Sequence, residues 1–241
     1  FRFAPKYFIG CSGTLVRADR AENVFRFGIG PVVKGQKIKS LVPTIYFVDT
    51  RYVGFSLNLK DYSRQKHQLL DDLCNSKARN KLIVQQAVKA ALAGRHVLVL
   101  SERVAHVSEL FSMLEKELSF QFIRVGKMVG SSKKEEREFA QTAQVLVATS
   151  QLLAVGFNNP RLDTLIFATP MQSVVQPVGR VIRQHPDKKP PIVIDLVEAS
   201  SKSARILGKS RAKKYREKGW KLEHVHVLDD PKPAVQEWRL R

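Results

Sequence analysis

The residues best suited to chemistry in this sequence are two arginines, Arg180 and Arg183, at the end of the segment Q-P-V-G-R-V-I-R. Three positions apart on a helix, they would present two forked cations on one face. A triphosphate needs such cations when negative charge builds on its leaving oxygens during phosphoryl transfer. A solvated basic helix would show the same spacing, so the neighbouring segments must decide between the two interpretations.

Three short apolar runs accompany the arginine pair, and their length and β-branched content predict buried parallel strands. They cover residues 145–148, 165–168 and 192–196. Polar residues follow the first two runs, and in an open parallel sheet the segments just past the strand ends line the ligand crevice. Further strands are predicted at 45–48, 97–100 and 122–125, and helices at 61–73, 75–93 and 133–142.

The order of these segments resembles motifs V and VI of superfamily 2 helicases, in their second RecA-like lobe. The match to Q-x-x-G-R-x-x-R begins at Gln176, with Pro177 where an arginine is common. The resemblance implies an α/β fold of the P-loop NTPase type, a RecA-like parallel sheet flanked by helices. It also implies that Arg180 and Arg183 are arginine fingers, that Gln176 lies near the γ-phosphate, and that Gly179 belongs to the ATP site.

Motif V is matched by Gly156 and by Asn158, which stands where the family often has an aspartate at the ribose. Both residues are therefore expected in the ATP site. Thr149 matches the family threonine that binds a backbone phosphate of the translocated strand, and Ser150 follows it. A threonine commonly ends a strand for structural reasons alone, but the glycine seven residues later favours the match.

Ser101 and Arg103 follow the predicted strand at 97–100 and resemble motif IV, so both are candidates for nucleic-acid contact. The Ser101 hydroxyl could reach a phosphate. Equally, this serine could simply cap the next helix. His106, three residues after Arg103, is expected on the helix surface without a partner.

Near the start of the sequence, Ser12, Gly13 and Thr14 resemble motif III, which is usually Ser-Ala-Thr and couples the two lobes. A strand followed by a Ser/Gly/Thr turn is the plain alternative. The step G-I-G-P-V-V at 28–33 also resembles the XPB/UvsW-like branch, which we group with the poxvirus transcript-release helicases.

The sequence contains neither a G-x-x-x-x-G-K-[ST] phosphate loop nor a D-E-x-[DH] metal motif. We therefore expect residues 1–36 to end a first lobe, 37–222 to form the second lobe and 223–241 to form a C-terminal tail. ATP and Mg²⁺ would be bound mainly by the missing N-terminal RecA-like lobe, the expected partner. This chain alone is then expected not to hydrolyse ATP.

The charge balance favours a polyanionic partner, with 41 Lys and Arg against 22 Asp and Glu and a formal net charge of +19. Much of the excess lies at residues 201–221, where a solvated face would normally mix signs. Lys213, Lys214 and Arg216 are the candidates there for phosphate contact. Tyr215 and Trp220 interleave them and could stack on bases.

Composition limits the remaining choices. Two cysteines give no disulfide framework and no metal spacing, so no metal site is expected and a reducing, intracellular compartment is indicated. The nucleus, the nucleoid and a viral replication site are not distinguished. No apolar run approaches the roughly 20 residues of a membrane span. DNA is favoured over RNA as the substrate, and no residue pattern in the sequence indicates recognition of a 2′-hydroxyl. An RNA helicase, a transcript-release factor and a non-catalytic nucleic-acid-binding module remain alternatives.

Overall fold

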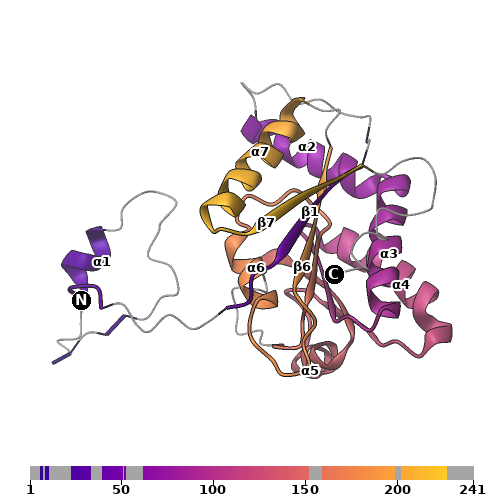
Figure 1. The fold of residues 1–241 in the computed structure, drawn as a ribbon, viewed down its shortest axis with the longest axis horizontal. Helices are drawn as coiled ribbons and strands as arrows, with labels where there is room; N and C mark the ends of the chain where they lie inside the picture. The colour runs from indigo at the N-terminus through magenta and orange to yellow at the C-terminus, as the bar shows by residue number, and fades with distance from the viewer. Residues whose placement is uncertain are drawn as a thin grey trace. The chain divides into compact units, whose positions relative to one another are not determined.

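The computed structural model describes residues 6–7, 9–10, 23–33, 40–50, 52, 62–151, 159–198 and 202–226 (Figure 1). The chain divides into two units, Phe1–Lys39 and Ser40–Arg241. The first contains the short helix α1 (Asn23–Gly28). The motif III candidates Ser12, Gly13 and Thr14 lie outside the described residues.

The second unit is built on a parallel sheet. Among the described residues, seven strands pair in the order β3-β4-β2-β5-β6-β1-β7. Every residue of β2, β4 and β5 is buried, as expected for strands that are covered on both faces. The strands are β1 (Thr44–Asp49), β2 (Val97–Ser101), β3 (Val125–Met128), β4 (Val145–Thr149), β5 (Thr164–Phe167), β6 (Ile192–Val197) and β7 (Lys221–His226).

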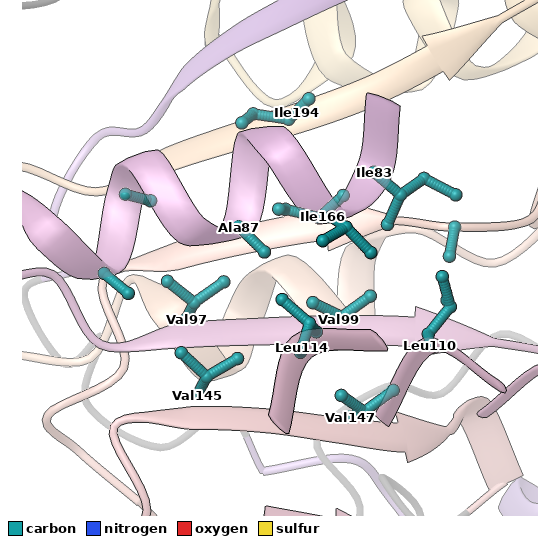
Figure 2. Packing of buried hydrophobic residues seen from close by; sticks show 14 of the residues in the cluster. Ile83, Ala87, Val97, Val99, Leu110, Leu114, Val145, Val147, Ile166 and Ile194 are labelled. Carbon is teal, nitrogen blue, oxygen red and sulfur yellow. The ribbon is translucent and has the colours of Figure 1, made fainter. Parts of the chain in front are cut away.

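One face of the sheet is covered by α3 (Lys77–Leu92) and α4 (Val104–Leu118), with α2 (Tyr62–Asn75) preceding them. Ile83 and Ala87 of α3 and Leu110 and Leu114 of α4 are fully buried. Figure 2 shows these four side chains over Val99 and its neighbours on the strands. The apolar residues recur at helical spacing on α3 and α4, so each helix buries one stripe against the sheet.

The opposite face is covered by α5 (Lys134–Thr142), α6 (Val175–Val181) and α7 (Lys202–Glu217), through a second apolar cluster. Figure 1 shows α3 and α4 on one side of β6 and α6 and α7 on the other. Where a connection leads to a strand nearer the β3 end of the sheet, its helices lie on the face of α3 and α4. Where a connection leads to a strand nearer the β7 end, its helix lies on the face of α5, α6 and α7, as right-handed crossovers require. The strands β2 and β5 pair with each other, yet the helices that follow them, α4 and α6, pack on opposite faces of the sheet. Ligands of open parallel sheets bind in the crevice between two strands of this kind, at their carboxyl ends.

The predicted α/β fold is confirmed, and the strands predicted at 45–48, 97–100, 145–148, 165–168 and 192–196 are present. The strand predicted at 122–125 is wrong, because β3 begins at Val125. Phe122 instead lies in the turn after a 3₁₀ turn (Ser119–Gln121), with a left-handed φ of 55° and 95% exposure. β7 continues the sheet to His226, past the predicted domain end at residue 222, and 227–241 lie outside the described residues. The division of the chain into domains stays a prediction.

A buried ion pair fastens α7 to the sheet. Arg211 is 2% exposed, and its Nε and Nη2 donate to the two carboxylate oxygens of Asp195 in β6, each at 2.8 Å. The Tyr215 hydroxyl donates to the same carboxylate at 2.9 Å, and its ring packs 5.8 Å from those of Phe47 and Trp220. Burial, and then the Asp195 charge, raises the pKa of Tyr215, so it remains a donor. The prediction that Tyr215 stacks on bases is wrong.

Replacing Arg211 should test how much the fold depends on this pair. Arg211→Met leaves the Asp195 charge buried without its partner, which should lower the free energy of unfolding by about 3–5 kcal/mol. Urea denaturation followed by circular dichroism at neutral pH measures the change. Arg205→Met, at an exposed position of the same helix, should change stability by less than about 0.5 kcal/mol. Equal effects of the two substitutions would contradict this account.

Candidate active site and nucleic-acid interface

The arginine segment, residues 176–183, begins on α6 and so lies on the face of the sheet that α5, α6 and α7 cover. The α6 helix starts after the loop that leaves β5 and runs back toward the other edge, where the Ile182 carbonyl accepts the Leu41 N–H at 2.9 Å just before β1. Gln176 and Arg180 are on the helix. Arg183 lies two residues past its end at Val181, rather than on the helix as expected.

The two guanidinium groups interact. Arg180 is half-buried; its burial lowers its pKa, and the charge of Arg183 lowers it further. Two cations that repel each other at a partly buried position would be stabilised by an anion placed between them. Gly179 faces open space, since a Cβ built there would meet no heavy atom within 4 Å. A phosphate could therefore approach the helix backbone beside the arginines. Gln176, one turn earlier, is exposed.

At the carboxyl edge of the sheet, a buried hydrogen-bond network holds the segment between β2 and α4. The Ser101 hydroxyl donates to His106 Nδ1 at 3.0 Å and accepts the Arg103 N–H at 3.1 Å. His106 Nε2 donates to Asn80 Oδ1 at 2.9 Å, an orientation fixed because Asn80 Nδ2 donates to the Cys74 carbonyl. Burial, and then the charge of Arg79, lowers the pKa of His106 to about 4, so the imidazole is neutral at pH 7.

This network corrects two expectations. His106 is 2% exposed and bonded at both nitrogens, so its predicted surface position is wrong. The helical period contained the signal, because His106 is four residues before Leu110 and so shares its buried stripe. Ser101 is fully buried and its hydroxyl already has two partners, so it shapes the start of α4 instead of facing outward.

The other predicted nucleic-acid residues have different settings. Thr149 ends β4 beside Ser101 in register, is 5% exposed, and is followed by the half-buried Ser150. Arg103 Nε lies 3.0 Å from the Asp71 carboxylate of α2, so a phosphate would share this arginine with an existing partner. The structure thus brings Ser101, Thr149 and Arg103 to one edge of the sheet. Gly156 and Asn158 lie outside the described residues.

Two residues that the sequence analysis did not select tie this edge together. Arg79, on the first turn of α3, places Nε 2.8 Å from the Glu198 carboxylate after β6 and donates to the Ala168 carbonyl after β5. The Thr169 hydroxyl accepts the Glu102 N–H at 3.0 Å, joining the ends of β5 and β2. Each of the two residues bonds a backbone group that is distant in sequence, and Arg79 also pairs with a distant carboxylate, so their sequence neighbourhood gives no signal for these contacts.

The basic segment forms α7, and its cations differ in how far they are buried. Arg211 is buried, whereas four cations at spacings of four, four and three residues are exposed and form one stripe, Arg205, Lys209, Lys213 and Arg216. Lys214 is half-buried, and its Nζ donates to the Gln172 carbonyl at 2.6 Å, in the loop before α6. Of the three lysine and arginine candidates, Lys213 and Arg216 therefore face outward most.

Cofactor chemistry follows from these donors. The polar groups of the arginine segment are mainly cationic, which suits phosphate oxygens and not Mg²⁺. Within the described ranges, no group of three or more His, Cys, Asp or Glu residues could hold a metal ion. In the same part of the chain, no helix has the length and apolar character to cross a membrane.

Comparisons with known proteins agree with the fold. No protein-family model matches the chain. The chain is 22% identical over 248 residues to a putative ATP-dependent RNA helicase of Acanthamoeba polyphaga mimivirus and 30% identical over 236 residues to a putative helicase of Invertebrate iridescent virus 6. These matches cover 98% and 89% of this chain but 47% and 50% of the relatives, so the chain spans about half their length.

The structure of a third relative is known. The ATP-dependent DNA helicase uvsW of Enterobacteria phage T4 is 26% identical over 153 residues, which are 61% of this chain and 30% of that protein. Its crystal structure superposes with a TM-score of 0.57 at 18% identity, covering 79% of this chain and 43% of that one. We conclude that the chain belongs to the superfamily 2 helicases and that its parallel sheet is one of their RecA-like lobes.

Proposed function

We propose that this chain is the second RecA-like lobe of an ATP-dependent helicase or translocase of the XPB/UvsW-like branch, and that Arg180 and Arg183 complete an ATP site on another lobe. The pair of interacting guanidinium groups at the end of α6, beside the open approach at Gly179, is the observation that carries the proposal. Two relatives are named as ATP-dependent helicases, which supports the use of ATP.

The chemistry assigned to this lobe is electrostatic. ATP, held with Mg²⁺ mainly by the first lobe, supplies the phosphoryl group. Arg180 and Arg183 place two forked cations against the oxygens on which charge develops, and their mutual repulsion favours closure onto an anion. Gln176, exposed on the first turn of α6, offers its amide to the γ-phosphate or to the attacking water.

The nucleic acid is assigned to the carboxyl edge and to α7. Thr149, Ser150 and Arg103 contact the strand, while Ser101 holds the segment that carries Arg103. Closing and opening of the cleft between this lobe and the first lobe would then move the protein along the nucleic-acid strand. The relatives are named as RNA and as DNA helicases, so DNA, which we favour, and RNA are tested side by side.

The arginine pair gives the first test, in the full-length protein. Arg180→Ala or Arg183→Ala should leave ATP affinity nearly unchanged, because the other lobe holds most of the nucleotide. Steady-state turnover should fall on the order of 10³–10⁵-fold, because the charge acts mainly in the transition state. Lysine at either position should not rescue turnover, since a point charge does not reproduce the planar fork.

Three controls accompany this experiment. Arg124→Ala, an exposed arginine next to β3, should behave as the unmodified protein. The 241-residue chain alone should show no turnover. Binding of nucleic acid without ATP should survive in both arginine variants. If the variants instead hydrolyse ATP normally and no longer bind nucleic acid, α6 belongs to a binding surface and the alternative of a non-catalytic binding module is correct.

The exposed stripe of α7 gives the second test. Neutralising Lys209, Lys213 and Arg216 to glutamine should weaken binding of all sequences alike. The slope of log affinity against log salt should fall by about 0.7–0.9 for each phosphate that is no longer neutralised. Lys214 is kept, because its ammonium group bonds the Gln172 carbonyl. Fluorescence anisotropy with matched single-stranded DNA and RNA, titrated with salt, measures both quantities.

A charge-matched control separates the stripe from net charge. Lys116, Lys127 and Lys134 are exposed on α4, β3 and α5, and their replacement by glutamine removes the same three charges. This variant should keep most of the salt slope. Equal reductions of the slope in the two triple variants would mean that α7 contributes only to the overall charge.

A further inference from the structure

Lys188 joins two segments that lie far apart in the sequence. Its Nζ donates to the Arg183 carbonyl at 2.8 Å and to the Pro160 carbonyl at 3.1 Å. The first carbonyl belongs to the exit of α6. The second belongs to the turn that precedes β5, two positions after the motif V candidate Asn158. A half-buried ammonium group therefore connects the ends of the two segments that carry the family resemblance.

The contact satisfies a backbone carbonyl just past the end of α6. Backbone groups that leave regular structure need other hydrogen-bond partners. At this end the Val178 carbonyl accepts the Ile182 N–H at 3.2 Å, and the Ile182 carbonyl accepts the Leu41 N–H at 2.9 Å. The Arg183 carbonyl is taken by Lys188. A lysine is suited to this place, because the C-terminal end of a helix carries partial negative charge.

We propose that Lys188 is a positioning residue for the second arginine, holding the backbone of Arg183 against the turn at Pro160 so that the arginine side chain starts from a fixed point. The inference rests on the proposed role of Arg183 in ATP turnover. The Nζ of Lys188 contacts two backbone carbonyls. Small displacements of a group that acts in the transition state reduce turnover strongly, so a tie at this carbonyl affects rate more than binding.

The surroundings of Lys188 make its charge sensitive to pH. Burial lowers its pKa to about 8, against the attraction of Asp163 and with the repulsion of Arg183. Asp163 is itself buried, and it accepts the Thr164 hydroxyl at 2.7 Å and Arg95 Nη1 at 3.4 Å. His96 also interacts with Asp163, and the charged or titratable groups that in turn act on His96 are Arg161 and His185.

The lowered pKa also predicts how stability responds to pH. Folding disfavours the ammonium form, so its cost to stability is fully present below a pH of about 8 and disappears as pH rises toward the unfolded pKa of 10.5. Removing the lysine removes this cost together with two hydrogen bonds, one of them to the exposed Arg183, where water can replace it, so we expect little net loss of stability. A residue kept only for stability would behave in the opposite way.

The test uses the full-length protein with Lys188→Met, Lys188→Arg and, as a matched control, Lys189→Met. Lys189 donates to the Ala93 carbonyl and not to α6. With Lys188→Met, kcat for ATP should fall about tenfold while KM changes less than about twofold. Melting temperature should not fall. Lys188→Arg should restore most of kcat, and Lys189→Met should match the unmodified protein.

A pH profile supplies a readout that a structural role would not move. In the unmodified protein the ammonium loses its proton as pH rises through about 8. The neutral amine holds the two carbonyls less strongly than the ammonium, so kcat should decline part of the way toward that of Lys188→Met. Arginine stays protonated over this range, so Lys188→Arg should keep its kcat there. An alkaline decline that is the same in both proteins would overturn the inference.

Comparison with Arg183→Ala separates this inference from the proposed function. If Arg183→Ala turns over ATP normally, the role of the arginine fails, and the positioning role fails with it. If Arg183→Ala is inactive but Lys188→Met keeps normal kcat, only the inference about Lys188 is overturned. A Lys188→Met protein that melts earlier at unchanged kcat would likewise show a purely structural lysine.

Discussion

The parallel direction of the strands is the constraint on which the rest of this lobe depends. Every connection must leave the sheet at its carboxyl edge and return to the opposite edge, so the ends of β2, β4, β5 and β6 meet in one place. Where these strands end, the backbone N–H and C=O groups that follow them need hydrogen-bond partners other than a neighbouring strand. Arg79, Thr169 and the Ser101–His106–Asn80 network do this with buried side chains. The edge that carries the candidate contacts with nucleic acid is therefore also internally cross-linked.

The basic residues of this chain have unequal physical roles. Arg211 uses its charge inside the molecule, where Asp195 and Tyr215 orient α7 on β6. This orientation of the helix places the stripe from Arg205 to Arg216 on the outside. Arg180 and Arg183 form a third group, in which like charges are held near each other. The cations behind the net charge of +19 therefore include a buried ion pair, an exposed stripe and a pair of like charges, and each of these has a different effect on stability.

The sequence predicted those features that depend on local pattern. Apolar runs located β1, β2, β4, β5 and β6, since a strand buried on both faces has a distinctive composition. The predictions for Tyr215 and His106 failed because both polar groups found buried partners on distant elements, Asp195 and Asn80. Lys188 carries no sequence signal, because its acceptors are backbone carbonyls, which every residue possesses. The sequence predicted a helix that carries both Arg180 and Arg183, but α6 ends at Val181, where the Leu41 N–H bonds the Ile182 carbonyl.

The turn at Phe122 shortens β3, and this has a consequence for contacts between molecules. β3 is at one end of the strand order and has only four residues. Lys127 is the exposed residue of this strand, and its Nζ lies 5.4 Å from the centre of the Phe111 ring. A short edge strand with a lysine offers a poor template for a strand from another chain, because pairing would bury the charge. We therefore expect this border of the sheet to resist edge-to-edge aggregation.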